Sequence, residues 1–333
     1  MSLNITMPLD ADKQKSAGAI PAVLHDIVSE LAASLWVDQQ EKADLAWLAM
    51  IPPEDTHRCR LAVYDTAAED PVKFCAGALH LLKTEPGPPS RFYLVEHLLA
   101  SGLLLIPLCD SLSFGRKKAV ALGQALAALD PMLEEKLLDR VRDGTTTGFG
   151  ALNGLAAERA MEICGAISDG TRVEGKLTML MQHPNPRIRS KAGLLLSRKK
   201  RDPEWAEQHT AMEADPRLRA NILEGLWGVD TEEARAVLWD GVADANNRVV
   251  ANAVIGLNRL GEPAAPGLLR RLALHPSATF RSSAAWAMGE TRDSRFLDTL
   301  IALVKDAESI VRRQALRAMA RIQEVQASNR NPL

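Results

Sequence analysis

The chain has 333 residues, a formal net charge of −2 and a hydrophobic content of 47%, which is enough for a sizeable core. The near-neutral charge disfavours a nucleic-acid partner, because domains that bind phosphates are usually strongly basic. The charge is unevenly distributed: 17 basic and 24 acidic residues give residues 1–182 a net charge of −7, whereas 23 basic and 18 acidic residues give residues 183–333 a net charge of +5.

Residues 1–19 are polar and lack the basic start and apolar run of a secretory signal, so we expect a flexible N-terminal arm. The longest apolar run, Leu98–Leu108, is too short to span a bilayer. The four cysteines are widely spaced and form no CxxC pair, which indicates neither a zinc module nor a disulfide framework. We therefore expect a cytoplasmic protein with reduced thiols and no membrane partner.

From residue 20 to residue 150 we expect an irregular helical region, made of degenerate repeats or serving as a cap for the array that follows. Apolar residues recur here at helical spacing between breakers, of which the proline-rich stretch 84–90 is the strongest. The expected helices cover residues 20–37, 42–50, 57–68, 71–83, 91–106, 116–129 and 131–142. They do not fit a common repeat period, and we find no convincing strand pattern.

Residues 151–324 are expected to form a repeat array, with a C-terminal tail at 325–333. After two expected helices at 155–167 and 173–182, one apolar residue recurs every 30 or 31 residues. These anchor positions are Ile188, Leu218, Val249, Phe280 and Val311. Residues four and eight positions after each anchor are also apolar or Ala, so each unit contains a helix with one apolar face.

A second apolar segment fills each remaining interval, as at Thr231–Val242, Pro263–Leu274 and Ser294–Val304. Each unit is therefore predicted to contain two antiparallel helices. Seven positions after the anchor the residues are mostly small, as at Gly225 and Gly256, which predicts a close approach of neighbouring helices. One helix pair cannot bury its apolar face alone. We therefore predict an all-α fold in which helix pairs stack into an α-solenoid.

Two segments of the array carry a family resemblance. They are His183-Pro-Asn-Pro-Arg-Ile-Arg-Ser-Lys-Ala-Gly-Leu-Leu-Leu and Asp306-Ala-Glu-Ser-Ile-Val-Arg-Arg-Gln-Ala-Leu-Arg-Ala-Met. These segments resemble HEAT repeats, particularly the short bacterial repeats of the phycobilisome-lyase type. The resemblance implies a solenoid over residues 183–324. It implies no single function, since the family includes scaffolds, adaptors and a few enzymes.

Polar side chains recur on the anchor helices at positions away from the apolar face, so stacking would align them in columns. A solvated helix face is the alternative interpretation, because any exposed face must be polar. The candidate protein-binding strip consists of Arg187, Lys191, Arg217, Asn221, Arg248, Asn252, Arg259, Ser283 and Gln314. We expect this cationic, hydrogen-bonding strip to bind an acidic or extended segment of a protein partner.

We find no catalytic or metal-binding motif, so we expect no enzymatic activity and no cofactor. The seven histidines are not spaced to bind a metal ion from one helical face. Deoxyhypusine hydroxylase is similar to a HEAT solenoid too, but its iron site depends on His-Glu pairs, and no His-Glu dipeptide occurs here.

The alternative function is that of an alkylpurine DNA glycosylase of HEAT-like fold, or of another enzyme that acts on nucleic acid. Such an enzyme would use a tryptophan near an aspartate, as in Trp227 with Asp230 or Trp239 with Asp240. Neither spacing places both side chains on one helical face as an i, i+4 pair would. The near-neutral charge weakens this alternative further, because phosphate contacts supply much of the affinity for DNA.

The stretches Leu31–Gln40 and Leu61–Leu82, followed by such repeats, resemble an uncharacterised group of bacterial HEAT-like proteins encoded near type VI secretion genes. This resemblance implies a role in handling or loading a secreted protein. Together with the polar strip, it predicts a non-enzymatic scaffold or adaptor in a bacterial cytoplasm.

Overall fold

The computed structural model describes residues 22–52, 55–84, 91–110, 115–143, 152, 154–167 and 173–330. These residues are mostly helical, and no strand occurs among them, which confirms the all-α fold class. The chain divides into two compact units, Met1–Ser168 and Asp169–Leu333. The predicted arm at 1–19 and the predicted boundary between residues 150 and 151 lie outside the described residues, so both stay predictions.

The described part of the first unit consists of nine α-helices and one 3₁₀ helix. In chain order these are α1 (Ala22–Ala32), α2 (Leu35–Gln39), η2 (Ala46–Met50), α3 (Thr56–Glu69), α4 (Pro71–Thr84), α5 (Arg91–Ala100), α6 (Leu105–Cys109), α7 (Arg116–Ala127), α8 (Leu133–Asp143) and α9 (Gly154–Ile167). Helix α4 is a central element of this unit, because every residue from Phe74 to Leu79 is buried.

Three helices expected in this unit are interrupted or begin later than predicted. The helix expected over 20–37 is interrupted at Ala33 and Ser34, and the one expected over 42–50 begins only at Ala46. The helix expected over 91–106 breaks after Ala100, where Gly102 has a φ of 67°. This left-handed conformation favours glycine and cannot continue a right-handed helix. The apolar spacing alone did not reveal these breaks.

The described part of the second unit contains the regular repeats of the array, whereas α9, which was expected to lead into them, lies in the first unit. Its helices are α10 (Glu174–Leu180), α11 (Pro186–Lys200), α12 (Pro203–Met212), α13 (Pro216–Gly225), α14 (Glu232–Val242), α15 (Asn247–Arg259), α16 (Ala265–Ala273), α17 (Ala278–Thr291), η4 (Ser294–Phe296), α18 (Leu297–Leu303) and α19 (Ser309–Arg330). Helix α19 continues past residue 324, so the tail predicted from residue 325 is helical up to Arg330.

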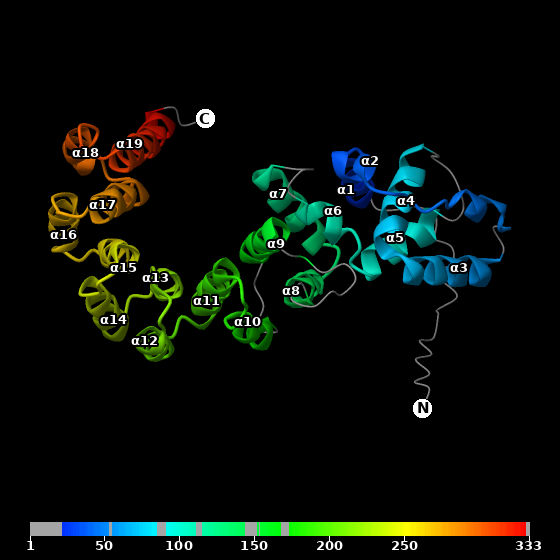
Figure 1. The fold of residues 1–333 in the computed structure, drawn as a ribbon, viewed down its shortest axis with the longest axis horizontal. Coiled ribbons are helices and arrows are strands. Elements are labelled where there is room, and N and C mark those ends of the chain that lie inside the picture. The colour runs from blue at the N-terminus through cyan, green and yellow to red at the C-terminus, as the bar shows by residue number, and fades with distance from the viewer. Residues whose placement is uncertain are drawn as a thin grey trace. The chain divides into compact units, whose positions relative to one another are not determined.

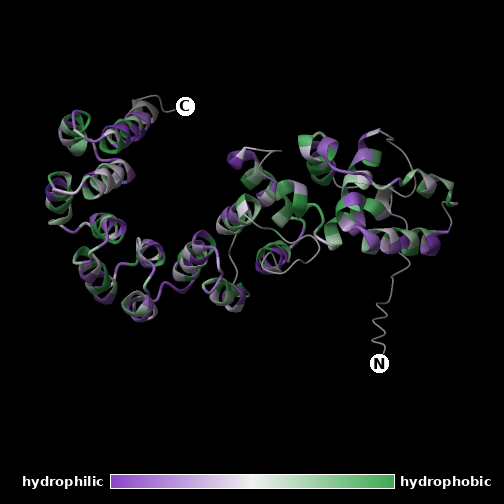
Figure 2. Ribbon diagram, in the orientation of Figure 1, coloured by the Kyte–Doolittle hydropathy of each residue, from purple (hydrophilic) through white to green (hydrophobic). Residues whose placement is uncertain are grey.

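Helices of the second unit form two rows, as Figure 1 shows. The inner row, on the concave side of the curve, consists of α11, α13, α15, α17 and α19, in which each helix packs against the next. The outer row consists of α12, α14, α16 and α18. Figure 2 shows that these helices carry hydrophobic and hydrophilic residues side by side. Apolar residues of these helices, such as Leu218, Leu238 and Leu269, are buried where neighbouring helices pack, and the predicted α-solenoid is confirmed.

All five anchors lie on inner helices. Ile188, Leu218, Val249 and Val311 are buried, whereas Phe280 is only partly buried. The Phe280 ring stacks on the ring of His275, with 4.1 Å between the centroids. The period of 30 or 31 residues therefore reports a real structural repeat.

Side-chain caps define where the inner helices begin. Asn185, Asp215 and Asn246 precede α11, α13 and α15, and each accepts a hydrogen bond from the backbone N–H two residues later. Pro186 and Pro216 occupy the first turn, where a missing N–H leaves no helical hydrogen bond unmade. These capping residues therefore make the inner helices begin at corresponding positions of successive repeats.

Glycines allow close approach between neighbouring helices of the array, as predicted for Gly225 and Gly256. A Cβ atom on Gly225 would lie 2.2 Å from the Ser197 hydroxyl, and one on Gly256 would lie 2.8 Å from a Leu238 methyl. On Gly289 of α17 it would lie 2.8 Å from the Cα atom of Ala318 in α19. A backbone atom cannot move aside as a flexible side chain can.

We expect Gly289→Ala to lower the free energy of unfolding by about 1–3 kcal/mol, because α17 and α19 must separate. This loss should exceed the gain of up to about 1 kcal/mol that alanine usually brings to a helix. Gly267→Ala in α16 is the matched control, because no atom lies within 4 Å of its added Cβ, and it should stabilise the protein. Urea unfolding measures both, and equal stability of the two variants would contradict the close approach.

Candidate functional site

A groove with a volume of about 720 Å³ lies across the inner helices α13, α15, α17 and α19. Each of α13, α17 and α19 contributes residues at one position before its anchor and at two, three and six positions after it. On α17 these residues are Thr279, Ser282, Ser283 and Trp286. The spacing i, i+3, i+4, i+7 is that of one helical face, so the groove is built from the same face of successive repeats.

The groove contains part of the strip predicted from the sequence. Six strip residues line it, namely Arg217, Asn221, Arg248, Asn252, Ser283 and Gln314. Arg187, Lys191 and Arg259 do not line it. Four chemically important lining residues were not predicted from the sequence to belong to the strip: Glu224, Trp286, Arg313 and Arg317. They occupy the positions two and six residues after the anchor of their helix. These are the positions i+3 and i+7 counted from the residue before the anchor, such as Arg217, so a search at helical spacing would have included them.

Four arginines dominate the charge of the groove. The guanidinium groups of Arg217, Arg248, Arg313 and Arg317 make no hydrogen bond or ion pair with any residue that the structure describes. Arg217 is partly buried and the other three are exposed. The groove therefore presents four cationic groups whose hydrogen-bond donors remain available to a ligand.

Glu224 is the one acidic residue in the lining of this groove. Burial raises the pKa of the Glu224 carboxyl above its ordinary value, while the nearby Arg198 and Lys191 lower it. The guanidinium of Arg198 donates to the Glu224 carboxylate over 2.9 Å. This carboxylate is thus partly neutralised by a residue outside the groove lining, and the groove has a net positive charge.

Two asparagines of the strip connect the inner helices to one another. The Asn221 side-chain amide donates to the Ser190 carbonyl of α11 over 2.8 Å, and that of Asn252 donates to the Ala220 carbonyl of α13 over 2.7 Å. Asn252 is only 4% exposed. Their N–H groups therefore hold successive repeats together and are already engaged before any partner binds.

Arg259, which we expected in the binding strip, packs on another residue of the array. Its guanidinium carbon lies 4.2 Å from the centre of the Trp227 ring, and the Trp227 indole N–H donates to the Asn252 carbonyl over 2.9 Å. The neighbouring Asp230 accepts from Arg235 over 2.6 Å. The tryptophan and aspartate proposed for base recognition thus each make their own contacts within the array. Trp239 and Asp240 are exposed on the outer helix α14.

A second set of arginines follows the anchors directly and links the repeats; we call Arg189, Arg219, Arg281 and Arg312 the linking arginines. Arg219 donates to the carbonyls of Glu213 and Ala214 in the turn before its own helix, over 2.9 and 3.1 Å. It also donates to both carboxylate oxygens of Asp244 in the next repeat, over 3.0 and 3.1 Å. One guanidinium therefore holds two turns in place.

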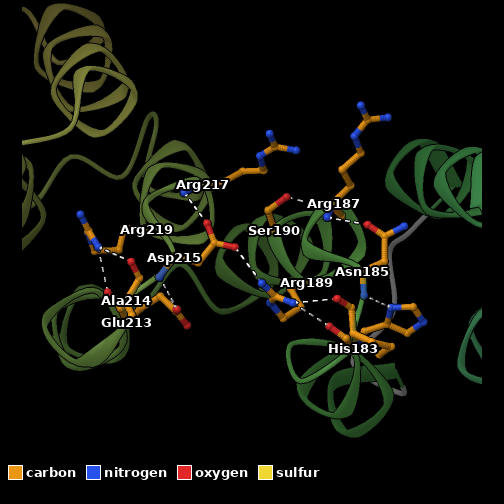
Figure 3. A network of polar contacts seen from close by, with 11 residues as sticks. His183, Asn185, Arg187, Arg189, Ser190, Glu213, Ala214, Asp215, Arg217 and Arg219 are labelled. Atoms are coloured by element: carbon orange, nitrogen blue, oxygen red, sulfur yellow. Dashed lines mark hydrogen bonds and ion pairs between the residues drawn. The ribbon is translucent and has the colours of Figure 1, made fainter. Parts of the chain in front are cut away.

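The same arrangement recurs with small variations. Arg189 donates to Asp215 over 3.0 Å, and Arg281 donates to both oxygens of Asp306 over 2.7 and 2.9 Å. Arg312, in the last inner helix, contacts only turn carbonyls. Figure 3 shows the part of this network around Arg189, Asp215 and Arg219, with the side chains of Arg187 and Arg217 extending away from it. The sequence showed an arginine at this position in four units but not its role.

The linking arrangement is interrupted between α15 and α17. Val250 occupies the position of the linking arginine, and His275 occupies the position that is aspartate in the neighbouring repeats. In its place the side-chain amide of Asn247 donates to the Ser283 hydroxyl over 2.6 Å, at the floor of the groove. The two halves of the groove are therefore joined by a neutral hydrogen bond.

The Asp306 carboxylate makes the stability of the array depend on pH. Hydrogen bonds from Arg281 hold the pKa of Asp306 below its ordinary value. Because the unfolded chain binds a proton more readily, the contribution of Asp306 is complete above its unfolded pKa of about 3.9 and is lost as the pH falls through the lower folded pKa. We expect Asp306→Asn to be less stable than the unmodified protein at pH 5, with the difference shrinking toward pH 2 in urea titrations. A constant difference would show that Asp306 does not titrate with its partner.

Within the described part of the chain, no group of three or more His, Cys, Asp or Glu side chains is placed to hold a metal ion. The helices described for this chain also include none that is both long and apolar enough to cross a membrane.

Comparison with known families identifies the repeats of the second unit. Residues 203–282 and 265–330 match the family model for HEAT repeats. The part of the array from residue 203 to residue 330 therefore matches HEAT repeats. The resemblance seen in the sequence is thus confirmed, and the groove lies on the inner face of HEAT repeats. A comparison with curated proteins gives no match.

Two solved structures are similar to this chain at low identity. Human deoxyhypusine hydroxylase in complex with glycerol is 17% identical, with a TM-score of 0.36, over 82% of this chain and 100% of that protein. The complex of CpcE and CpcF of phycocyanin lyase from Nostoc is 17% identical, with a TM-score of 0.40, over 67% of this chain and 93% of the matched chain.

Proposed function

We propose that the HEAT repeats form a non-enzymatic adaptor or scaffold that binds an acidic segment of a protein partner in the groove across α13, α15, α17 and α19. The observation that carries this proposal is the set of four guanidinium groups that have no partner among the described residues. Arginine binds carboxylates through two parallel hydrogen bonds.

The contrast with other arginines of the array argues against a merely solvated surface. The linking arginines Arg189, Arg219 and Arg281 each bind an aspartate of the next repeat, and Arg198 binds Glu224. Single exposed arginines are common on protein surfaces. Four that face one hollow beside a tryptophan are expected where an anionic, partly apolar ligand binds.

A protein partner fits the groove better than nucleic acid. The groove contains Glu224, which would repel a continuous phosphate backbone, and it has too few basic residues for the many phosphate contacts typical of DNA binding. An acidic protein segment needs only two or three carboxylates, placed where the arginines lie. Nucleic-acid binding is therefore the alternative outcome of the experiment below.

The resemblance to bacterial proteins encoded near type VI secretion genes supports a more specific role. We propose that the partner is a secreted protein or a component that handles one, and that binding takes place in the cytoplasm. An adaptor of this kind needs a reversible contact, which exposed charged residues supply because their attraction is moderate and sensitive to salt.

Affinity purification from the native host tests the proposal. We expect a stoichiometric, nuclease-resistant protein partner to co-purify with the unmodified chain and to be lost with Arg248→Gln/Arg313→Gln. Arg271→Gln/Lys305→Gln removes the same charge at exposed residues outside the groove lining and should retain the partner. Retention by both double variants, or recovery of nucleic acid that depends on the groove arginines, would overturn the proposal.

A further inference from the structure

The two ends of the groove differ chemically from its middle. At one end α13 and α15 provide Arg217 and Arg248, and at the other end α19 provides Arg313 and Arg317. Helix α17 lies between them and contributes no charged residue to the lining. The cationic groups are therefore separated into two clusters, with a neutral stretch between.

Helices α17 and α19 also contribute neutral hydrogen-bonding and apolar groups to the groove. The Ser282 hydroxyl and the Gln314 amide make no hydrogen bond with any of the residues described here. The groove lining also includes Trp286, which is partly buried, and Ile310, which is 50% exposed. A ligand that crosses the groove would meet unsatisfied polar groups and an apolar surface together.

We propose that the groove recognises an extended peptide segment of about eight or nine residues, with acidic residues toward both ends and an apolar side chain in the middle. This inference rests on the proposed function and specifies its partner. Neighbouring inner helices pack 8–10 Å apart in general, so the three steps from α13 to α19 span roughly 27 Å. At about 3.3 Å per residue, an extended chain crosses that distance in eight or nine residues.

The free hydrogen-bonding groups favour an extended segment over a helical one. The backbone N–H and C=O groups of a helix are bonded within the helix, whereas those of an extended segment need external partners. Ser282 on α17 and Gln314 on α19 offer both donors and acceptors within the groove. A bound segment in this conformation would also direct alternate side chains toward the groove, which places one of them against Trp286.

The separation of the arginine clusters sets the charge pattern of the segment. Arg248 on α15 and Arg313 on α19 are two helix steps apart, which is roughly 18 Å or about five or six extended residues. Acidic residues gathered at one end could reach only one cluster. A segment that has them at both ends can satisfy both, so the order of residues should matter as well as the net charge.

Two synthetic peptides with the same composition test this order. The first is Glu-Asp-Ser-Thr-Leu-Ser-Thr-Asp-Glu, and the second gathers all four acidic residues at the N-terminus. We expect the full-length protein to bind the first roughly tenfold more tightly in fluorescence anisotropy. Each of Arg248→Gln and Arg313→Gln should weaken it and reduce its dependence on salt. Equal affinity for the two peptides would overturn the inference.

The central apolar contact has its own readout. Trp286→Gln should weaken binding of the first peptide roughly tenfold with its salt dependence unchanged, and should make no difference to a peptide with glycine in place of the leucine. Trp286→Phe, which keeps an aromatic ring, should restore most of the affinity. The inference fails if Trp286→Gln, with an unchanged Tm, binds the first peptide as tightly as the unmodified protein does. It also fails if a single-stranded oligonucleotide of nine nucleotides binds more tightly than the peptides.

These outcomes are distinguishable from failure of the proposed function. If the native partner depends on Arg248 and Arg313 but neither peptide order nor Trp286 affects binding, the extended segment is wrong and the binding groove stands. If the native partner is retained when Arg248 and Arg313 are both replaced, the proposed function fails, and the inference fails with it.

Discussion

Replacing Arg217, Arg248 and Arg313 together by glutamate is expected to abolish binding of the acidic partner, with a loss of affinity of more than 100-fold. The change converts three attractive charges into three repulsive ones, and like charges placed together in an interface cost several kcal/mol. The fold should be retained, because none of the three guanidinium groups has a partner within the described residues. The melting temperature and the affinity at several salt concentrations measure the two effects.

Arg259 is left out of this variant although the sequence placed it in the strip. Its packing on Trp227 would couple any loss of binding to a change in the array. The matched control replaces Arg271, Arg292 and Lys305 by glutamate, since these residues lie outside the groove lining. Full affinity in the variant would show that the groove does not bind the partner, and an equal loss in the control would show that net charge rather than the groove determines binding.

Replacing the linking arginine Arg219 by glutamine should lower the free energy of unfolding by about 2–4 kcal/mol. The change removes hydrogen bonds to the carbonyls of Glu213 and Ala214 and leaves the Asp244 carboxylate, which is 18% exposed, without its cation. The loss is large because the same group stabilises a turn of its own repeat and the capping turn of the next. Urea unfolding followed by circular dichroism measures it.

Arg312→Gln is the internal comparison for Arg219→Gln. It removes hydrogen bonds to the carbonyls of Asp306 and Ala307 and no bond to a following repeat, so we expect a loss of about 1 kcal/mol. Asp244→Asn, introduced into the unmodified protein and into Arg219→Gln, completes a double-mutant cycle that isolates the link between repeats. If the two arginine variants were equally destabilised, the link to Asp244 would contribute nothing.

The architecture of the array was predictable because its evidence is repeated. The apolar anchors recur at nearly constant spacing, and each inner helix begins at a local cap such as Asp215. The linking arginines also recur in the sequence, but their partners lie 25 or 26 residues away. Only the stacked structure shows that Arg219 reaches Asp244. In the first unit, breaks such as the one at Gly102 depend on backbone conformation, which the apolar pattern does not record.

The groove was predictable only in part for a related reason. Arginine recurs one position before the anchor, at Arg217 and Arg248, so a column of one residue type revealed it. Six positions after the anchor the residue type changes from Glu224 to Trp286 to Arg317. A column without a shared residue type gives no repeated signal. The chemistry that differs between repeats is therefore the part that requires the structure.

Photo-crosslinking of the native partner to single positions on the array shows directly whether the partner occupies the groove. A photoreactive phenylalanine analogue replaces Ser282 in the groove or Ile301, which is 48% exposed on the outer helix α18. We predict that the partner crosslinks through an acidic segment at Ser282 and does not crosslink at Ile301. Crosslinking at Ile301 without crosslinking at Ser282 would show that the partner binds outside the groove.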